Sequence, residues 1–305
     1  MRHRKKLIVI VGPTGVGKTD YCIDMARELD TCILNADSRQ IYSELKIGTA
    51  SPTEEQMRQV KHYFVGNLHI DDYYSASMYE NDVLHLLDHL FTNNDVAMMS
   101  GGSMMYIDAV CNGIDDIPTV DEHTRETLKR RLAEEGLPAL VEELRRLDPE
   151  HYEFVDKKNP RRVVHALEIC HMTGNTYSSY RTNTKKQRPF NIIKIGLNRP
   201  REELYARINQ RVLEMMDLGL EEEARSVLPY RHLNSLNTVG YRELFDYFDG
   251  NITLDDAILK IQSNSRRYMR KQLTWFMRDK SIKWVEPNNI KEIYNFIDKT
   301  ICLNP

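Results

Sequence analysis

Eight residues near the start of this chain constrain its fold more than any other segment. Residues 12–19 read Gly-Pro-Thr-Gly-Val-Gly-Lys-Thr and directly follow the apolar run 7–11. A strand, a glycine-rich turn and a helix in this order form a phosphate-binding loop, or P-loop, whose backbone N–H groups wrap a di- or triphosphate. The following helix, residues 19–29, directs the positive end of its dipole at the anion.

The side chains of this loop predict the chemistry of the site. Lys18 neutralises phosphate oxygens, and the hydroxyl of Thr19 can hold Mg²⁺. We therefore expect a site for a diphosphate or a nucleotide, with Mg²⁺ as cofactor. Its predicted binding residues are Gly12, Pro13, Thr14, Gly15, Val16, Gly17, Lys18 and Thr19.

The rest of the first third predicts the sheet to which this loop belongs. Apolar, β-rich runs alternate with helical patterns, and a fourth run follows after a long interval; the runs are 7–11, 31–34, 96–99 and 192–197. Such alternation favours an α/β fold, a P-loop NTPase-like parallel sheet flanked by helices. Ligands of such sheets bind beyond the carboxyl ends of the strands.

The interval between the third and fourth runs differs from the sheet region. It has leucines at helical spacing, at positions 128, 132, 140, 144 and 147. We expect a helical insertion domain over 115–188, with the catalytic core formed by 1–114 and 189–305. Further helices are expected in the core over 201–218, 220–228, 241–248 and 254–277.

Composition excludes some classes of protein. The net charge is −3, and no apolar stretch approaches the roughly 18–20 residues that span a bilayer. The five cysteines are scattered without a C-x-x-C pair, which argues against a disulfide framework and a zinc cluster. His85, Asp88 and His89 superficially match an inverted zinc motif, but no third ligand is evident. We expect a cytoplasmic protein without a membrane partner, and a monomer.

Two strand ends carry further candidate residues. Asp37 follows the second run, where a carboxylate could accept a proton from a nucleophile or could simply cap a helix. The third run ends in Ser100-Gly101-Gly102-Ser103, where an ordinary P-loop ATPase would place an acidic residue for Mg²⁺ and water. The Gly-Gly turn is either a second anion site or a plain turn. The missing acid disfavours a motor or switch NTPase.

Basic residues are grouped in four clusters although the chain is slightly acidic. The clusters are 125–131, 157–162, 181–188 and 266–271. Each cluster alone is typical of a solvated helix face. Because three of the four fall in or beside the insertion, together they indicate a basic face for a polyanion, with Tyr177 and Tyr180 available to stack on bases.

Taken together, the motifs resemble the tRNA dimethylallyltransferase family, also called tRNA isopentenyltransferases. The matching segments span nearly the whole chain: 12–19, Asp-Ser-Arg-Gln-Ile-Tyr at 37–42, Ile-Gly-Thr-Ala at 47–50, Tyr-Ser-Ala at 74–76, Gly-Gly-Ser at 101–103, Asn-Pro-Arg-Arg at 159–162, Val-Gly-Tyr-Arg at 239–242 and Arg-Lys-Gln-Leu-Thr-Trp-Phe at 270–276. The zinc-finger tail of eukaryotic relatives is absent, which favours the bacterial type.

The resemblance implies transfer of a dimethylallyl group from dimethylallyl diphosphate to the exocyclic amine of an adenine. That adenine lies 3′ of the anticodon in tRNAs that read codons beginning with U, and pyrophosphate leaves. Asp37 is implied as general base, while Lys18 and Thr19 act on the leaving group with Mg²⁺. The helical insertion would grip the anticodon stem-loop. The residues implied to contact tRNA are Asp37, Ser38, Arg39, Gln40, Ser103, Arg125, Arg161, Arg162, Val163, Val164, His165 and Arg242.

Two other functions remain open from the sequence. A small-molecule P-loop kinase would use Asp37 as base toward a hydroxyl and ATP as donor, with the basic insertion imitating a lid. A non-catalytic RNA-binding protein would use a nucleotide as a switch and would not depend on Asp37.

Overall fold

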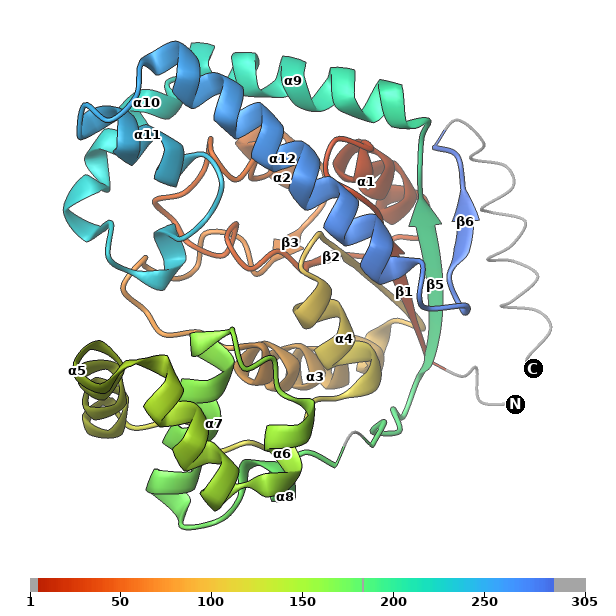
Figure 1. Ribbon diagram of the computed structural model, residues 1–305. Coiled ribbons are helices and arrows are strands. Elements are labelled where there is room, and N and C mark those ends of the chain that lie inside the picture. The colour runs from red at the N-terminus through yellow and green to blue at the C-terminus, as the bar shows by residue number, and fades with distance from the viewer. Residues whose placement is uncertain (1–4, 183, 288–305) are drawn as a thin grey trace. The chain divides into compact units, whose positions relative to one another are not determined.

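A parallel sheet of six strands forms the centre of the first of two compact units (Figure 1). The computed structural model describes residues 5–182 and 184–287. Unit 1 comprises the residues up to Cys111 and those from Arg188 onward, and unit 2 comprises Asn112–Gln187. The predicted insertion begins three residues later than unit 2 and ends one residue later.

The strands of unit 1 are ordered β3-β2-β4-β1-β5-β6. They are β1 (Lys6–Val11), β2 (Ile33–Asn35), β3 (His62–Tyr63), β4 (Val96–Ser100), β5 (Asn191–Leu197) and β6 (Lys283–Val285). Strand β1 pairs with β4 on one side, Ile8 opposite Met98, and with β5 on the other, Ile8 opposite Ile193. The P-loop strand is therefore central, and this position explains why its whole sequence is buried.

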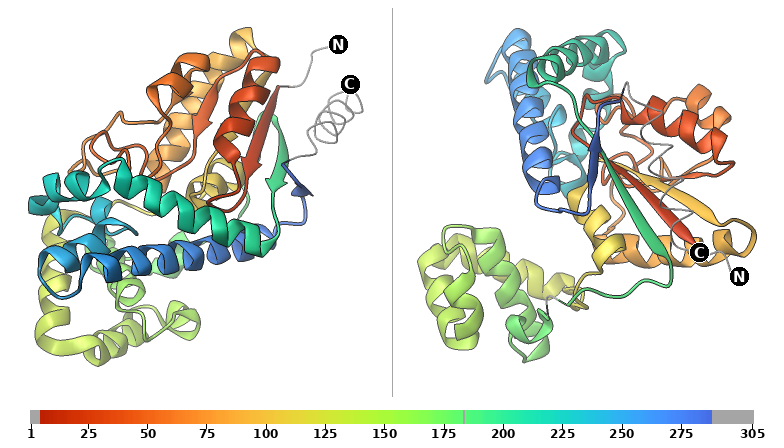
Figure 2. Two further views of the ribbon diagram at one scale, coloured as in Figure 1. Left: turned by 90° about the horizontal axis from the view of Figure 1, so that it is seen from above. Right: turned by 90° about the vertical axis from the view of Figure 1, so that its right-hand side faces the viewer.

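Helices cover both faces of this sheet (Figure 2). The helices of unit 1 are α1 (Lys18–Glu28), α2 (Glu54–Gln59), α3 (Ala76–Asn93), α4 (Met104–Asn112), α9 (Arg201–Asp217), α10 (Leu220–Ser226), α11 (Tyr241–Phe248) and α12 (Leu254–Phe276), with short 3₁₀ turns at Leu228–Tyr230 and Asn234–Leu236. Ile8 and Ile10 pack with residues of α1, α9 and α12. The alternate residues of β1, Leu7 and Val9, pack with α3 and α4 on the other face, as the two-residue period of a strand requires.

The predicted α/β class is confirmed, and the predicted strands and helices agree with the structure to within a few residues at each end. The edge strands β3 and β6 were not expected, because two or three residues are too short to give a periodic signal. Helix α2 was also missed; it is only six residues long and depends on a capping box between Thr53 and Gln56. Among the described residues, no helix has the length and apolar character needed to cross a bilayer.

Unit 2 is a small helical body with its own core. Its helices are α5 (Glu122–Leu147), α6 (Pro149–Phe154), α7 (Pro160–Thr173) and α8 (Tyr177–Tyr180). Helix α5 is kinked at Gly136, which has φ 80°, just before Pro138. Leu128, Leu140 and Leu144 of α5 are buried against α7 residues such as Leu167, which accounts for the leucine spacing in the sequence.

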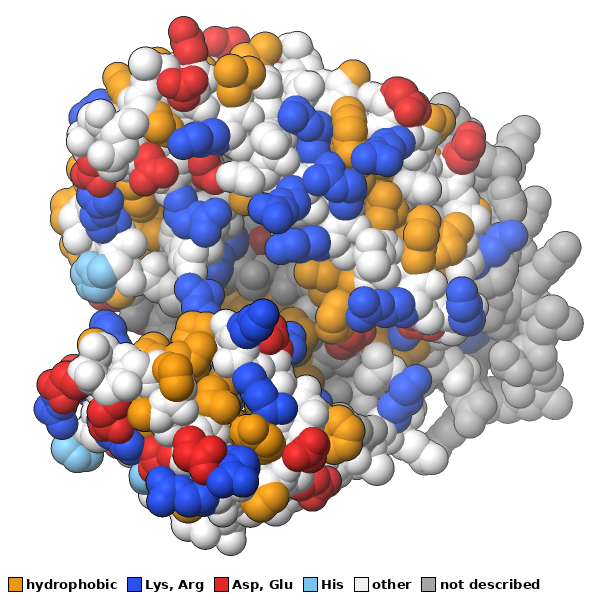
Figure 3. All heavy atoms as spheres, viewed as in Figure 1, with side chains coloured by type: hydrophobic (Ala, Val, Ile, Leu, Met, Phe, Trp, Pro, Cys, Tyr) orange, Lys and Arg blue, Asp and Glu red, His pale blue; other side chains and the backbone are white. Residues whose placement is uncertain are grey.

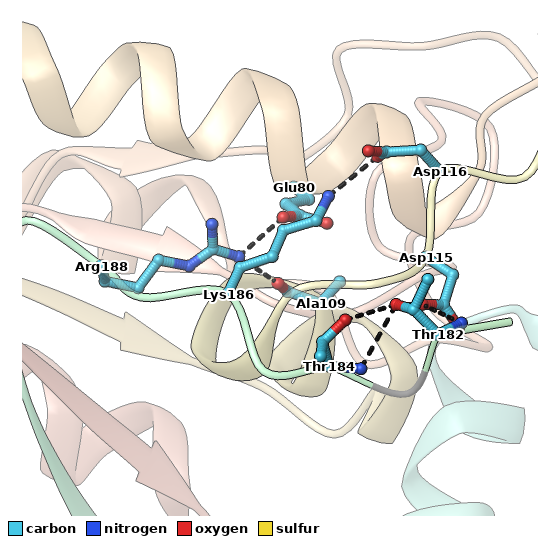
Figure 4. A network of polar contacts seen from close by, with 8 residues as sticks. All are labelled: Glu80, Ala109, Asp115, Asp116, Thr182, Thr184, Lys186 and Arg188. Carbon is cyan, nitrogen blue, oxygen red and sulfur yellow. Dashed lines mark hydrogen bonds and ion pairs between the residues drawn. The ribbon is translucent and has the colours of Figure 1, made fainter. Parts of the chain in front are cut away.

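Each unit anchors its own end of the two connecting segments (Figure 4). Within unit 2, Asp115 accepts hydrogen bonds from the N–H and hydroxyl of Thr182, and Lys186 pairs with Asp116 at 2.8 Å. Within unit 1, the guanidinium of Arg188 pairs with Glu80 at 2.7 Å and donates to the carbonyls of Ala109 and Val110 at the end of α4.

Candidate active site

The carboxyl ends of β1, β2 and β4 open into one cavity of about 1150 Å³ within unit 1. The loops after these strands meet there because parallel strands end at the same edge of a sheet. The lining includes Lys18 and Thr19 of the P-loop, Asp37 and Gln40 after β2, and the Gly101–Gly102 turn after β4. Helices α9 and α12 close the cavity with residues including Arg207, Arg211, Tyr268 and Gln272.

The P-loop packs so closely against β5 and α9 that Gly12 and Gly15 have no room for a side chain. A Cβ on Gly12 would lie 2.6 Å from the carbonyl oxygen of Leu197, and one on Gly15 would lie 2.9 Å from Ile208. Gly17, at φ 96°, forms the left-handed cap from which α1 starts. Only glycine at these positions therefore lets the backbone follow this path beside β5 and α9.

Lys18 lies at the base of the cavity, held by the loop itself. Its Nζ donates to the carbonyls of Gly12 at 2.9 Å and Pro13 at 3.0 Å. Burial, together with the nearby charge of Arg211, lowers the pKa of Lys18 to about 8, while Asp37 acts in the opposite direction. Burial disfavours the charged form of Lys18, so an anionic ligand bound next to it would stabilise that charged form strongly.

Three arginines that the sequence did not indicate brace the P-loop from the segment after β5. Arg207 donates to the carbonyl of Gly15 at 2.7 Å, and Arg211 donates to the hydroxyl of Thr14 at 2.8 Å. Arg199 donates to the carbonyl of Val16 at 2.9 Å. Arg207 and Arg211 are four residues apart and share one face of α9. That spacing, directly after a predicted strand, was the available sequence signal.

Asp37 closes a turn after β2 and does not cap a helix, because residues 38–41 form a turn. Its Oδ1 accepts hydrogen bonds from the N–H groups of Arg39 at 2.9 Å and Gln40 at 3.3 Å, which fixes the turn after β2. Its Oδ2 is directed toward the Gly101–Gly102 turn, 3.7 Å from where a Cβ on Gly102 would lie. One oxygen thus builds the turn, and the other is available to a ligand in the cavity.

The Gly-Gly turn is required by packing. A Cβ on Gly101 would lie 2.1 Å from the carbonyl oxygen of Ala36, so β2 and β4 can end side by side only with glycine there. Ser103, which the family resemblance implies as a contact with tRNA, is buried and donates its N–H to the same carbonyl of Ala36.

A buried amide joins this turn to the P-loop. Gln272 of α12 is 1% exposed; its Oε1 accepts from the N–H of Thr14 at 2.8 Å, and its Nε2 donates to the carbonyl of Gly102 at 3.0 Å. Tyr268, one turn earlier, donates to the same carbonyl of Gly102 at 3.2 Å. Helix α12, which carries the basic cluster 266–271, therefore supplies two residues of the cavity.

The remaining predicted contacts with tRNA are divided between the units. In unit 1, Arg242 is exposed on α11 and donates to Asn237 at 3.4 Å. In unit 2, Arg161 and Arg162 are exposed in the first turn of α7. Val163 is fully buried in the core of unit 2, so its side chain shapes the helix and offers no atom to a ligand.

Ion pairs separate the basic residues into structural and available ones. Arg131 pairs with Glu135 at 2.6 Å and with Glu143 at 2.7 Å, so its charge is already balanced. By contrast, Arg161 and Arg162 form no ion pair with an acidic side chain within residues 5–182 and 184–287. The same holds there for Arg266 and Arg270.

Lys and Arg side chains gather on the surface over α9 and α12 (Figure 3). At the junction of these helices, Arg201 and Arg270 donate to the hydroxyl of Tyr205 at 2.9 and 2.8 Å. Arg266 lies over the ring of the same tyrosine.

The residues that superficially match a zinc motif, His85, Asp88 and His89, are exposed on α3. Among the described residues, no cluster of three metal-binding side chains occurs.

Comparison with known proteins identifies the family. A model of the IPP transferase family matches residues 40–279. The chain is 62% identical over 291 residues to tRNA dimethylallyltransferase 1 of Phocaeicola vulgatus, and this alignment covers 95% of this chain and 97% of that protein. It is 59% identical to tRNA dimethylallyltransferase 1 of Bacteroides thetaiotaomicron, over 95% of this chain and 94% of that one.

Solved structures agree with these sequence matches. The full-length tRNA isopentenylpyrophosphate transferase of Bacillus halodurans is 34% identical, with a TM-score of 0.72 over 98% of this chain and 97% of that one. A eukaryotic dimethylallyltransferase acting on tRNA has a TM-score of 0.84 at 20% identity, over 99% of this chain and 80% of that one, a likeness of fold alone.

Fold and cavity thus define an α/β protein of the P-loop-like class with a cavity at the carboxyl ends of its strands. The matches then narrow this class to one family of prenyltransferases. The chain belongs to the IPP transferase family.

Proposed function

We propose that this enzyme transfers the dimethylallyl group of dimethylallyl diphosphate to the exocyclic amine of the adenine 3′ of the anticodon, in tRNAs that read codons beginning with U. The general activity, transfer of a dimethylallyl group to tRNA, follows from the family. The observation that supports this mechanism is the cavity in which the carboxylate of Asp37 and the P-loop occur together.

The P-loop side of the cavity suits the diphosphate of the donor. When the bond between the allylic carbon and the diphosphate oxygen breaks, negative charge grows on the departing pyrophosphate. Lys18, Arg211 and N–H groups of the P-loop other than those of Thr14 and Val16, which bond to Gln272 and Pro13, would stabilise that charge. Lys18 would then exchange its two carbonyl partners, Gly12 and Pro13, for phosphate oxygens.

The residues fit a bound Mg²⁺ of the kind that a substrate helps to hold. Thr19 lines the cavity next to Lys18, and no acidic cluster is present in the described residues to form an all-protein cage. Mg²⁺ is commonly bound by one protein oxygen, substrate phosphates and water. When bound through Thr19, the ion would supply further positive charge to the leaving group.

Asp37 would act on the acceptor. As the new bond from the adenine nitrogen to the allylic carbon forms, the amine must lose a proton, and Oδ2 of Asp37 would take it. Oδ1 stays in its hydrogen bonds to Arg39 and Gln40, so the carboxylate is held in orientation. No water attacks, which is consistent with the missing acid after β4. The adenine must leave its stack to reach the cavity, at a cost of a few kcal/mol.

Contacts with the RNA backbone would come from the exposed arginines without acidic partners. In unit 2 these include Arg161 and Arg162, with Arg125 and His165 as further expected contacts. We therefore assign unit 2 the role of gripping the anticodon stem-loop. In unit 1, the turn at 37–40 would contact the loop of the RNA, together with Arg242, whose guanidinium also lies 3.8 Å from Glu243.

One assay tests the reaction, the donor and the acceptor together. Purified protein is incubated with Mg²⁺, dimethylallyl diphosphate and unmodified tRNA, and the digested nucleosides are weighed by mass spectrometry. An adenosine heavier by one dimethylallyl group, located next to the anticodon, is the expected product. Unchanged adenosine from protein that binds the diphosphate would contradict the proposal and favour ATP-dependent phosphoryl transfer instead.

A further inference from the structure

Gln40 enters the cavity with its amide orientation fixed by the backbone. Its Nε2 donates both hydrogens, to the carbonyls of Thr49 and Ala50, each at 2.9 Å. The amide cannot be turned over, because its oxygen would then face two carbonyl oxygens. The atom of Gln40 left for a ligand is therefore the acceptor Oε1. Together with Oδ2 of Asp37, it would match the two hydrogens of an amino group.

The segment that provides these carbonyls is bonded to one carboxylate from a helix that lies far away along the chain. Glu223 of α10 accepts hydrogen bonds from the N–H groups of Lys46 at 2.9 Å and Ile47 at 2.8 Å through Oε2. Its Oε1 accepts from the N–H of Gly48 at 2.9 Å and from the hydroxyl of Tyr241 at 2.7 Å. Four donors thus converge on the carboxylate of Glu223.

Other features of the segment show that its backbone is tightly constrained. A Cβ on Gly48 would lie 2.7 Å from the ring of Tyr241, so the backbone is pressed against that ring. Ala50 has φ 50°, a left-handed conformation that a residue with a side chain adopts only when its surroundings impose it. Burial and the charge of Glu223 raise the pKa of Tyr241, so its hydroxyl remains a donor.

We propose that Glu223 is a positioning residue for the transfer reaction, which acts by holding residues 46–48 so that Thr49 and Ala50 fix Gln40 as an acceptor for the adenine amine. This role depends on the proposed function of Asp37 and the adenine. It extends the site to α10, whose Glu223 is not among the residues that line the cavity.

Glu223→Gln tests the role with little change of shape. The new amide would place a donor against backbone N–H groups, so the segment should shift. Displacement of a catalytic contact by about 1 Å can cost about a hundredfold in rate, and we expect kcat to fall between about tenfold and about a hundredfold. The KM for dimethylallyl diphosphate should stay the same, because this network does not contact the P-loop. Glu222→Gln, an exposed neighbour in α10, is the matched control and should retain kcat.

A double-mutant cycle with Gln40→Ala separates positioning from general destabilisation. If Glu223 acts through Gln40, Glu223→Gln should cause little further loss of kcat once Gln40 is alanine. If the losses of kcat in the two single variants multiply in the double variant, or if Glu223→Gln has a normal kcat, the proposal is overturned. If Glu223→Gln does not fold, Tyr241→Phe removes one donor and should show the same dependence on Gln40. A wild-type enzyme that leaves tRNA unmodified would instead overturn the proposed function itself.

Discussion

Asp37 has a structural role in the fold and a separate role in the proposed chemistry. Its Oδ1 closes the turn after β2, and its Oδ2 remains for the substrate. A structural role alone would make Asn an adequate replacement, because the amide oxygen of Asn can accept the same two hydrogen bonds. The substitution therefore separates the two roles.

We expect Asp37→Asn to lower kcat by about 10² to about 10⁴, the usual contribution of a general base, with little change in thermal stability. Single-turnover rates with saturating tRNA and donor measure the effect. Asp24→Asn, at an exposed position of α1, is the control and should be normal. Near-normal turnover in Asp37→Asn would reduce Asp37 to a turn-forming residue.

The ionisation of Lys18 should make the activity of the enzyme depend on pH. Because burial and Arg211 lower its pKa to about 8, the free enzyme carries this charge below that pH and loses it above. The kcat/KM for dimethylallyl diphosphate should therefore fall as pH rises from about 8 toward 9.5, by up to about tenfold per pH unit. Lys18→Arg keeps its charge throughout this range and should flatten the profile, even if its activity is lower. An unchanged decline in that variant would assign the ionisation to another group.

At the scale of elements, α12 organises the cavity from outside the sheet. Gln272 joins the P-loop after β1 to the turn after β4, so the two loops cannot move apart independently. A buried amide with both of its groups in use is well suited to this task, because either unpaired partner would be costly.

Gln272→Leu should leave the N–H of Thr14 and one lone pair of Gly102 unpaired, at about 1–3 kcal/mol in stability. We also expect a higher KM for dimethylallyl diphosphate, since Thr14 belongs to the site proposed for it. Urea unfolding and steady-state kinetics measure the two effects. Gln262→Leu, in the same helix but bonded to Asn209 away from the cavity, is the control for the KM. Equal KM values in the two variants would contradict this role of Gln272.

At the scale of the whole molecule, Arg188 fixes the point at which the chain returns to unit 1. Its side chain and that of Glu80 are 7% and 4% exposed. Breaking a buried ion pair by removing one partner typically costs about 3–5 kcal/mol, so Arg188→Met should destabilise unit 1 by about that amount in urea unfolding. Arg145→Met, which removes an exposed pair with Glu142, should change stability by less than about 1 kcal/mol. Similar values for both variants would argue against a structural role for Arg188.

Binding of tRNA should depend steeply on salt despite the net negative charge of the chain. Each phosphate contact contributes about 0.7–0.9 to the slope of log affinity against log salt. The double variant Arg161→Ala, Arg162→Ala should therefore lower the slope by up to about 2, as measured by fluorescence anisotropy with labelled tRNA. Arg145→Ala, whose charge is already paired, should keep the wild-type slope. A slope unchanged in the double variant would place the RNA elsewhere.

Local sequence patterns determined the parallel sheet, the P-loop and the helical insertion. Each of these features is indicated by hydrophobic periodicity or by glycines a few residues apart, and such patterns can be recognised in the sequence without knowledge of tertiary contacts. The candidate roles of Lys18, Thr19 and Asp37 came from the same source, since a residue at the end of a parallel strand must lie at the ligand-binding edge.

Tertiary packing decided which other residues complete the site. Arg211, Gln272 and Glu223 come from helices at least 170 residues beyond the loops they contact, and no local pattern connects them. Packing also selected among basic residues that look alike in sequence: Arg131 and Arg188 are used in ion pairs, whereas Arg161 stays exposed. The physical reason is that hydrogen bonds and charge pairing depend on distances, which only the folded chain sets.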